Sequence, residues 1–228
     1  MKKNFFIAAF IMFVSIFILS ACLHAEITYN AVVTISGTSD EFTQEYTHSG
    51  TNGFLIVVVN FIPDNDQYVG LVTYNGVALI NEIYVQTRRD ARTDVWYLIN
   101  PPVGAYDVVV NLTGSAKTIV DIVSLTGVHQ TEPIYFWTNV SGTQVPSLYT
   151  TIQEETGNSI LGLGCTDSLA ETYALPGQII LWNETYNSEM RTQAAYATST
   201  QTGIVVVPNY MNEVCNWAAI FFNIKAAE

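Results

Sequence analysis

Residues 53–62, which read GFLIVVVNFI, decide the fold class of this chain. Apart from its glycine and asparagine the stretch is apolar, and it is rich in β-branched side chains, which favour strands. A continuous apolar run of this length is typical of a central strand that is covered on both faces. A second run of the same kind, IVVV at 204–207, lies near the end of the chain. Both runs predict strands that are covered on both faces or that pack against a neighbouring loop.

Strand signals recur at short intervals along the chain, separated by Gly, Pro, Asn and Asp. Asn75-Gly76 lies between two such runs and is a strong signal for a two-residue hairpin. The best helix candidate, at Ser168, reaches Pro176 within two turns. Many antiparallel strands with tight turns predict an all-β fold, a single antiparallel β-sandwich of jelly-roll type, with no linker and no internal repeat. We expect strands over 27–35, 53–62, 68–74, 77–85, 93–99, 106–112, 118–125, 159–165, 178–182, 192–197, 203–207 and 214–224.

The first 25 residues have the layout of a secretory leader, because two lysines precede an apolar run over 5–19. Two ways of cleaving this leader remain open. Cleavage after Ala25 would leave a mature domain over 26–228, whereas the string LSAC at 19–22 could act as a lipobox that makes Cys22 a lipidated first residue. A retained anchor is the third interpretation, since the run is close to the ~20 residues that span a bilayer. We expect an extracellular or cell-surface protein that meets a membrane only through its leader or a lipid anchor.

The charge balance excludes nucleic acid as a partner. The chain has 20 acidic and 8 basic residues, a net charge of −12, and two of the basic residues lie in the leader. Phosphate backbones are bound by clustered Lys and Arg. The one basic cluster, RRDARTD at 88–94, contains its own acids.

Several sequence segments resemble those of a recurrent family of secreted bacterial β-sandwich domains of the surface-adhesion or carbohydrate-binding type. They are SGTNGFL at 49–55, TYNGVAL at 73–79, WYLINPPVG at 96–104 and GVHQTEP at 127–133. The closing WAAIFFNIK at 217–225 resembles the last strand of that family. The resemblance implies a non-enzymatic domain that binds a glycan or a surface protein, and it supplies no catalytic motif.

Aromatic residues near predicted strand ends are the candidate ligand-binding residues. Trp137 lies in YFW at 135–137, and Trp182 and Tyr186 lie close to Asn183, the one candidate that is not aromatic. Sugar rings stack on exposed aromatic faces while an amide satisfies their hydroxyls. Core packing is the competing interpretation for both tryptophans.

Cys165 and Cys215 are the two cysteines outside the leader. An oxidising compartment favours a disulfide between them. It would close a loop of about 50 residues and contribute ~4 kcal/mol in the chain-entropy model. Two buried thiols are the alternative.

No cofactor is predicted, and calcium is the one that the sequence leaves open. Asp64, Asn65 and Asp66 lie between two predicted strands and offer three oxygen ligands in a row. An ordinary polar turn is the alternative interpretation.

Enzymatic activity is not expected. His48 and His129 are the only histidines after the leader, and both lie in predicted turns rather than near a recognisable nucleophile. A hydrolase with a carboxylate pair that forms on folding is the weakest alternative. The stronger rival is a self-associating structural subunit of a surface filament or coat. Its polar, β-prone segment 26–45 would pair either within its own sandwich or with a neighbouring subunit by strand addition.

Overall fold

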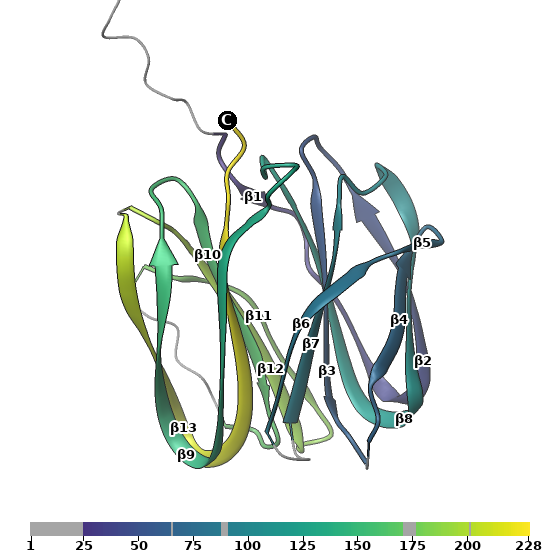
Figure 1. The fold of residues 1–228 in the computed structure, drawn as a ribbon. Helices are drawn as coiled ribbons and strands as arrows, with labels where there is room; N and C mark the ends of the chain where they lie inside the picture. The colour runs from purple at the N-terminus through teal and green to yellow at the C-terminus, as the bar shows by residue number, and fades with distance from the viewer. Residues whose placement is uncertain (1–24, 65, 88–90, 171–176, 201) are drawn as a thin grey trace, which may run out of the picture.

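The computed structural model describes residues 25–64, 66–87, 91–170, 177–200 and 202–228. These residues form two antiparallel sheets (Figure 1). They contain no helix long and apolar enough to cross a membrane. The predicted leader up to residue 24, including Cys22, lies outside these ranges. The strands are β1 (Thr28–Tyr29), β2 (Val33–His48), β3 (Phe54–Ile62), β4 (Val69–Tyr74), β5 (Val77–Ala78), β6 (Ile80–Thr87), β7 (Ala91–Ile99), β8 (Gly104–Thr126), β9 (Ile134–Glu154), β10 (Ser159–Thr166), β11 (Ile179–Tyr186), β12 (Met190–Thr198) and β13 (Gly203–Ile224).

The first sheet is built on a long ribbon of β2 and β8. The two strands pair along most of their length, with one irregularity between Ser39 and Glu41. The first limb of β8 continues into β4, and the second limb continues into β3, β7 and β6. The sheet therefore curls into a nearly closed barrel around an apolar core of its own, whose largest members include Tyr46, Phe61 and Tyr74.

The second sheet is built on a ribbon of β9 and β13, whose register breaks between Tyr210 and Cys215. Beyond this break β13 continues into β10, β12 and β11. The ribbon folds back on itself, so that the hydroxyls of Thr138 and Thr150, both on β9, lie 3.4 Å apart. A smaller apolar core that contains Trp217 lies within this fold.

The two sheets repeat one strand order. The path β2-β8-β3-β7-β6 in the first sheet matches β9-β13-β10-β12-β11 in the second. The register agrees as well, down to a bulge at the same place in β6 and β11. The chain thus contains two repeats, repeat 1 (β1–β8) and repeat 2 (β9–β13), and the expectation of no internal repeat was wrong. Equivalent residue pairs are Phe54–Leu125 and Ser159–Ile224, Ile80–Tyr97 and Ile179–Tyr196, and Asn60–Thr93 and Cys165–Thr192.

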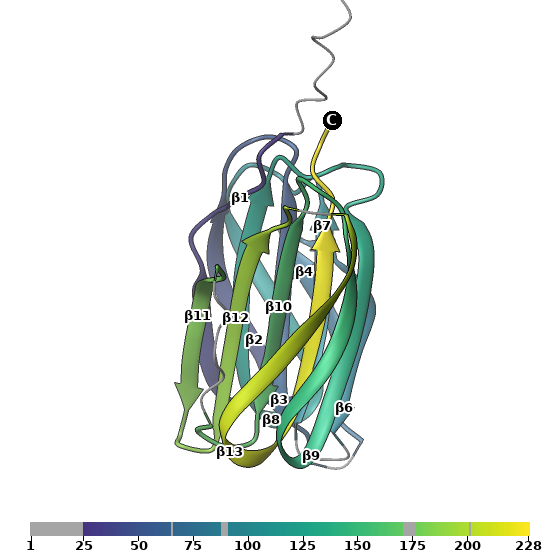
Figure 2. The same ribbon diagram turned by 90° about the vertical axis from the view of Figure 1, so that its left-hand side faces the viewer.

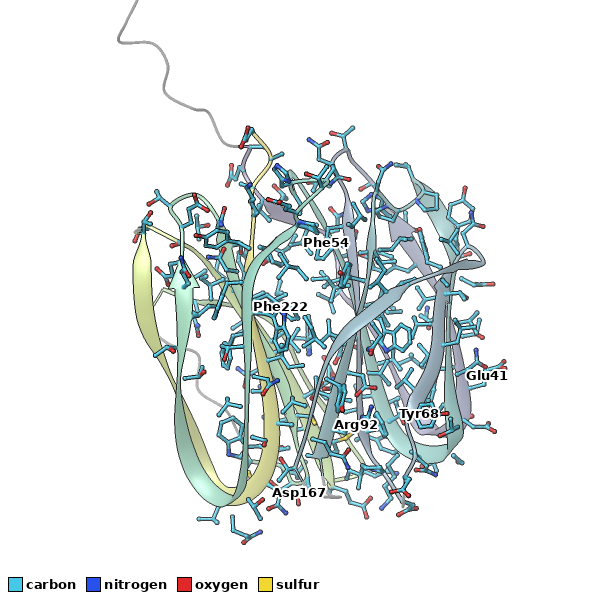
Figure 3. The ribbon with its side chains drawn as sticks, in the orientation of Figure 1. Glu41, Phe54, Tyr68, Arg92, Asp167 and Phe222 are labelled. Atoms are coloured by element: carbon cyan, nitrogen blue, oxygen red, sulfur yellow. The ribbon has the colours of Figure 1, made fainter. Side chains whose placement is uncertain are left out.

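The repeats pack through equivalent faces. Ile56 of β3 and its equivalent Leu161 of β10 both enter the central core between the sheets. Phe54 and Phe222 enter the same core from opposite sheets (Figure 3). The other face of β3 enters the core of repeat 1. The prediction that 53–62 forms a strand covered on both faces is therefore confirmed.

The predicted disulfide was wrong. Cys165 pairs with Ala218 and faces the central core, whereas Cys215 lies with Trp217 in the core of repeat 2. Because side chains alternate between the two faces of a sheet, the sheet itself separates the two sulfurs. Both residues are buried thiols. Burial raises the pKa of the Cys165 thiol to about 12.

The prediction of an all-β chain with antiparallel sheets is confirmed, but a jelly roll is not. Each sheet is instead organised around a folded two-stranded ribbon. The segment 26–45 supplies β1 and most of β2, and it pairs within its own chain through β8.

Candidate functional site

The loop between β8 and β9 is held by the end of the chain. The backbone N–H of His129 donates to the carbonyl of Lys225 at 2.9 Å, and the N–H of Lys225 donates to the carbonyl of Pro133 at 2.8 Å. Within the loop, Nδ1 of His129 accepts a hydrogen bond from the backbone N–H of Glu132 at 3.1 Å. These bonds fix the point at which β9 begins.

β9 begins at Ile134 and continues with three aromatic residues, Tyr135, Phe136 and Trp137. Ile134 and Phe136 pair with consecutive residues of β13, so Tyr135 is the extra residue of a β-bulge. Bulges at sheet edges redirect side chains and are frequent beside functional sites. All three rings are partly exposed, at 42%, 37% and 39%.

These rings border a surface pocket of about 510 Å³. One wall is Tyr97 of β7, so the pocket lies at the seam between the two repeats. Polar groups surround the rings: the Tyr135 hydroxyl accepts a hydrogen bond from Nε2 of Gln153 at 3.0 Å, and the exposed Glu132 carboxylate lies 3.6 Å from Nζ of Lys225. An aromatic wall beside hydroxyl and carboxylate oxygens can stack on a ring and accept hydrogen bonds from hydroxyls. The lining residues are Tyr97, Thr131, Glu132, Pro133, Ile134, Tyr135, Phe136 and Trp137.

The two predicted tryptophans have different environments. Trp137 lines the pocket. Trp182 is 4% exposed and lies in the central core, so core packing is the interpretation that holds for this residue. Its position is equivalent to that of Ile83 in repeat 1, and both residues follow the shared bulge and face the same core.

Asn183 and Tyr186 do not join Trp137. They lie on β11, at the opposite edge of the second sheet from β9 (Figure 2). Oδ1 of Asn183 accepts a hydrogen bond from Arg191 at 3.1 Å, and the Tyr186 hydroxyl lies 3.1 Å from Oγ1 of Thr38. The four predicted ligand-binding residues therefore do not form one site.

Sequence reasoning missed most of the pocket. Tyr135 and Phe136 could have been found, because three consecutive aromatic residues are unusual for a strand that only fills a core. Tyr97 could not, since it belongs to the other repeat and reaches the pocket only through the packing of the two sheets.

A serine and a histidine do meet, but inside the protein. Oγ of Ser124 lies 2.9 Å from Nδ1 of His48, and it also accepts a hydrogen bond from Nδ2 of Asn30 at 2.8 Å. Ser124 is 0% exposed and His48 is 1% exposed. Burial lowers the pKa of His48. Their burial leaves a substrate no access to the hydroxyl, so this network serves packing.

Asp121 is a buried carboxyl between the repeats. It accepts hydrogen bonds from Oγ1 of Thr34 at 2.7 Å, from Oγ1 of Thr192 at 3.0 Å and from Nδ2 of Asn60 at 3.2 Å. Burial raises its pKa to about 7, against the opposing effect of these bonds. The hydrogen bonds of Asp121 connect β8 with β2, β3 and β12. Because the Asp121 side chain is 0% exposed, its carboxyl does not face a ligand.

The predicted calcium turn is described only in part. Asp64 and Asp66 are exposed, and Asn65 lies outside the described residues. Among the residues that are described, His, Cys, Asp and Glu side chains form no group of three or more that could hold a metal ion. Calcium binding by this turn stays a prediction.

Comparison of the chain with protein-family models, with curated proteins and with solved structures finds no significant match. What stands of the resemblance to secreted surface domains is the all-β architecture with two antiparallel sheets.

Proposed function

We propose that this chain is a non-enzymatic domain, extracellular or attached to the cell surface, that binds glycan through the pocket at the start of β9. The observation that carries the proposal is the run Tyr135, Phe136 and Trp137, which a bulge holds partly exposed around a pocket of about 510 Å³.

The physical support is the cost of leaving such rings in water. Buried aromatic side chains contribute more stabilisation than most others, so three consecutive partly exposed rings at a pocket need a reason other than packing. A sugar ring supplies one, because its C–H face covers an aromatic ring while its hydroxyls bond to nearby polar groups. Thr131 and Glu132 provide such groups in the lining.

The proposal is tested by Trp137→Ala in the chain 26–228. The wild type is applied to an array of neutral and anionic glycans, and we expect it to retain a subset. Trp137→Ala should lose that retention, while its midpoint of thermal unfolding stays within a few degrees of the wild type because the ring is 39% exposed.

The matched control is Tyr68→Ala, which removes a ring that is 51% exposed on another part of the surface. It should bind as the wild type does. No retention of any glycan by the wild type, or equal retention by Trp137→Ala, would refute the proposal.

A further inference from the structure

The loop beside the pocket, residues 127–133, contains a hydrogen bond between one of its side chains and its own backbone. Backbone bonds to Lys225 hold the loop at His129 and at Pro133. Between these two points, the backbone N–H of Glu132 donates to Nδ1 of His129 at 3.1 Å. The shape of the loop at Glu132 therefore depends on an imidazole nitrogen that acts as an acceptor.

This bond requires a neutral imidazole. A backbone N–H can only donate, so Nδ1 of His129 must carry a lone pair and the ring proton must lie on Nε2. In an imidazolium both ring nitrogens carry protons, and neither accepts a hydrogen bond. The His129 side chain is half-buried, so solvent still reaches it. Histidine is also the side-chain type that ordinarily changes its charge between about pH 5 and pH 8.

Protonation of His129 affects two polar residues of the pocket lining. Oγ1 of Thr131 lies 3.3 Å from Nδ1 of His129, so a protonated Nδ1 can donate to this hydroxyl. The N–H of Glu132 then faces a donor in place of an acceptor, and the backbone must turn to find another partner. Thr131 and Glu132 both line the pocket, so this turn moves the groups that bond to sugar hydroxyls in the proposed function.

We infer that His129 makes glycan binding at this pocket sensitive to pH, because the neutral imidazole holds Thr131 and Glu132 in the binding arrangement and the imidazolium releases them. This inference rests on the proposed function and adds a form of regulation to the same site. The protein retains glycan at neutral pH and releases it in mildly acidic solution. His129 is a positioning residue, since it acts through the loop backbone.

The charges around the loop do not remove this dependence. The Glu132 carboxylate lies 3.6 Å from Nζ of Lys225, so it already has a cation as its partner. Attraction between this carboxylate and an imidazolium would not restore the lone pair that the Glu132 N–H needs. His48, which lies against Gly53, is 1% exposed, and burial lowers its pKa, which favours its neutral form. The charged or titratable groups below about pH 8 on the segments packed around the loop are Glu26, His48, Glu132, Lys225 and Glu228.

The test compares retention on the glycan array at pH 7.5 and at pH 5. His129→Asn is the informative variant, since its Oδ1 can replace Nδ1 as the acceptor and carries no charge at either pH. The wild type and His129→Asn should bind alike at pH 7.5. At pH 5 the wild type should bind about fivefold more weakly, the effect of roughly one hydrogen bond, whereas His129→Asn should bind as before.

A second readout needs no glycan. The amide resonance of Glu132 in NMR spectra should shift between pH 7.5 and pH 5 in the wild type, as the bond to His129 is lost, and should stay in place in His129→Asn. Asp121, whose pKa is about 7, is present in both proteins, so the difference between them reports on His129.

The outcomes separate this inference from the proposed function. If the wild type retains no glycan at pH 7.5, the proposed function is refuted, and the regulation with it. Equal retention by the wild type at both pH values, or an equal loss in His129→Asn, would overturn the regulation alone. Should His129→Asn unfold, a Glu132 resonance that does not move in the wild type would overturn the inference by itself.

Discussion

Replacing Asp121 by Asn should change how the stability of this protein depends on pH. The Asp121 carboxyl is 0% exposed and accepts hydrogen bonds from two threonine hydroxyls and the Asn60 amide, none of which carries a charge. The equivalent position in repeat 2 is Ile220, as the pairs with Val58 and Leu163 show. A carboxyl is therefore not required at this position by the strand arrangement.

The magnitude follows from the pKa of Asp121, about 7 in the folded protein. An unfolded aspartate has a pKa near 3.9, so the difference of about 3 between the two pKa values corresponds to about 4 kcal/mol. Below about pH 4 the carboxyl is protonated in both states and this effect is absent. As the pH rises from about 4 to about 7 only the unfolded state ionises, so the folded state loses relative stability, and above about 7 the loss is complete.

The assay is urea unfolding of the wild type and Asp121→Asn at several values between pH 4 and pH 8. The other carboxylates act alike in the two proteins, so the difference between the two curves isolates Asp121. We expect the wild type to lose about 4 kcal/mol relative to the variant across this range. Parallel curves would refute the assignment of a protonated, buried Asp121.

Two further predictions concern buried residues of repeat 2. Cys165 and Cys215 should each react with a thiol reagent after unfolding without a reductant, because the sheet keeps them on opposite faces; a chain with no reactive thiol under these conditions would contradict this. Trp182→Ala should destabilise the fold by about 3 to 5 kcal/mol through the cavity it leaves, yet retain glycan binding, and a variant of wild-type stability would show that the ring does not fill the central core.

The apolar strands could be predicted from the sequence, and the long polar ones could not. The run at 53–62 forms β3 almost to the residue, because its continuous apolar, β-branched composition favours a buried strand. β9, by contrast, was not predicted, since its Thr, Asn, Ser and Gln residues resemble a loop. β9 adopts a strand conformation because β13 pairs with it along most of its length.

Strand ends were also misjudged where a ribbon bends. The predicted strands 106–112 and 118–125 are the two limbs of β8, which continues without a break through the residues between them. The repeat left one local signal in the sequence, SGT at 36–38 in β2 and again at 141–143 in β9. Three common residues are too few to reveal a duplication, which became evident only from the pairing registers.

The candidate site could be predicted as far as one residue. Trp137 was identified because residue type and position near a strand end are visible in a sequence. The exposure that separates it from Trp182 depends on which strand lies at the edge of the sheet and which face meets repeat 1. The contribution of Tyr97 depends on the packing of two sheets that the sequence did not predict to be repeats.

The most direct measurement is acrylamide quenching of tryptophan fluorescence during titration with a neutral oligosaccharide that the array retains. Trp137 is 39% exposed, whereas Trp96, Trp182 and Trp217 are 7%, 4% and 3% exposed, so it should dominate the quenching. If glycan covers the pocket, quenching should fall with saturation as the ligand is added, and the Trp137→Phe variant should show little quenching at any ligand concentration. Undiminished quenching of Trp137 in protein saturated with the oligosaccharide would contradict binding at this pocket.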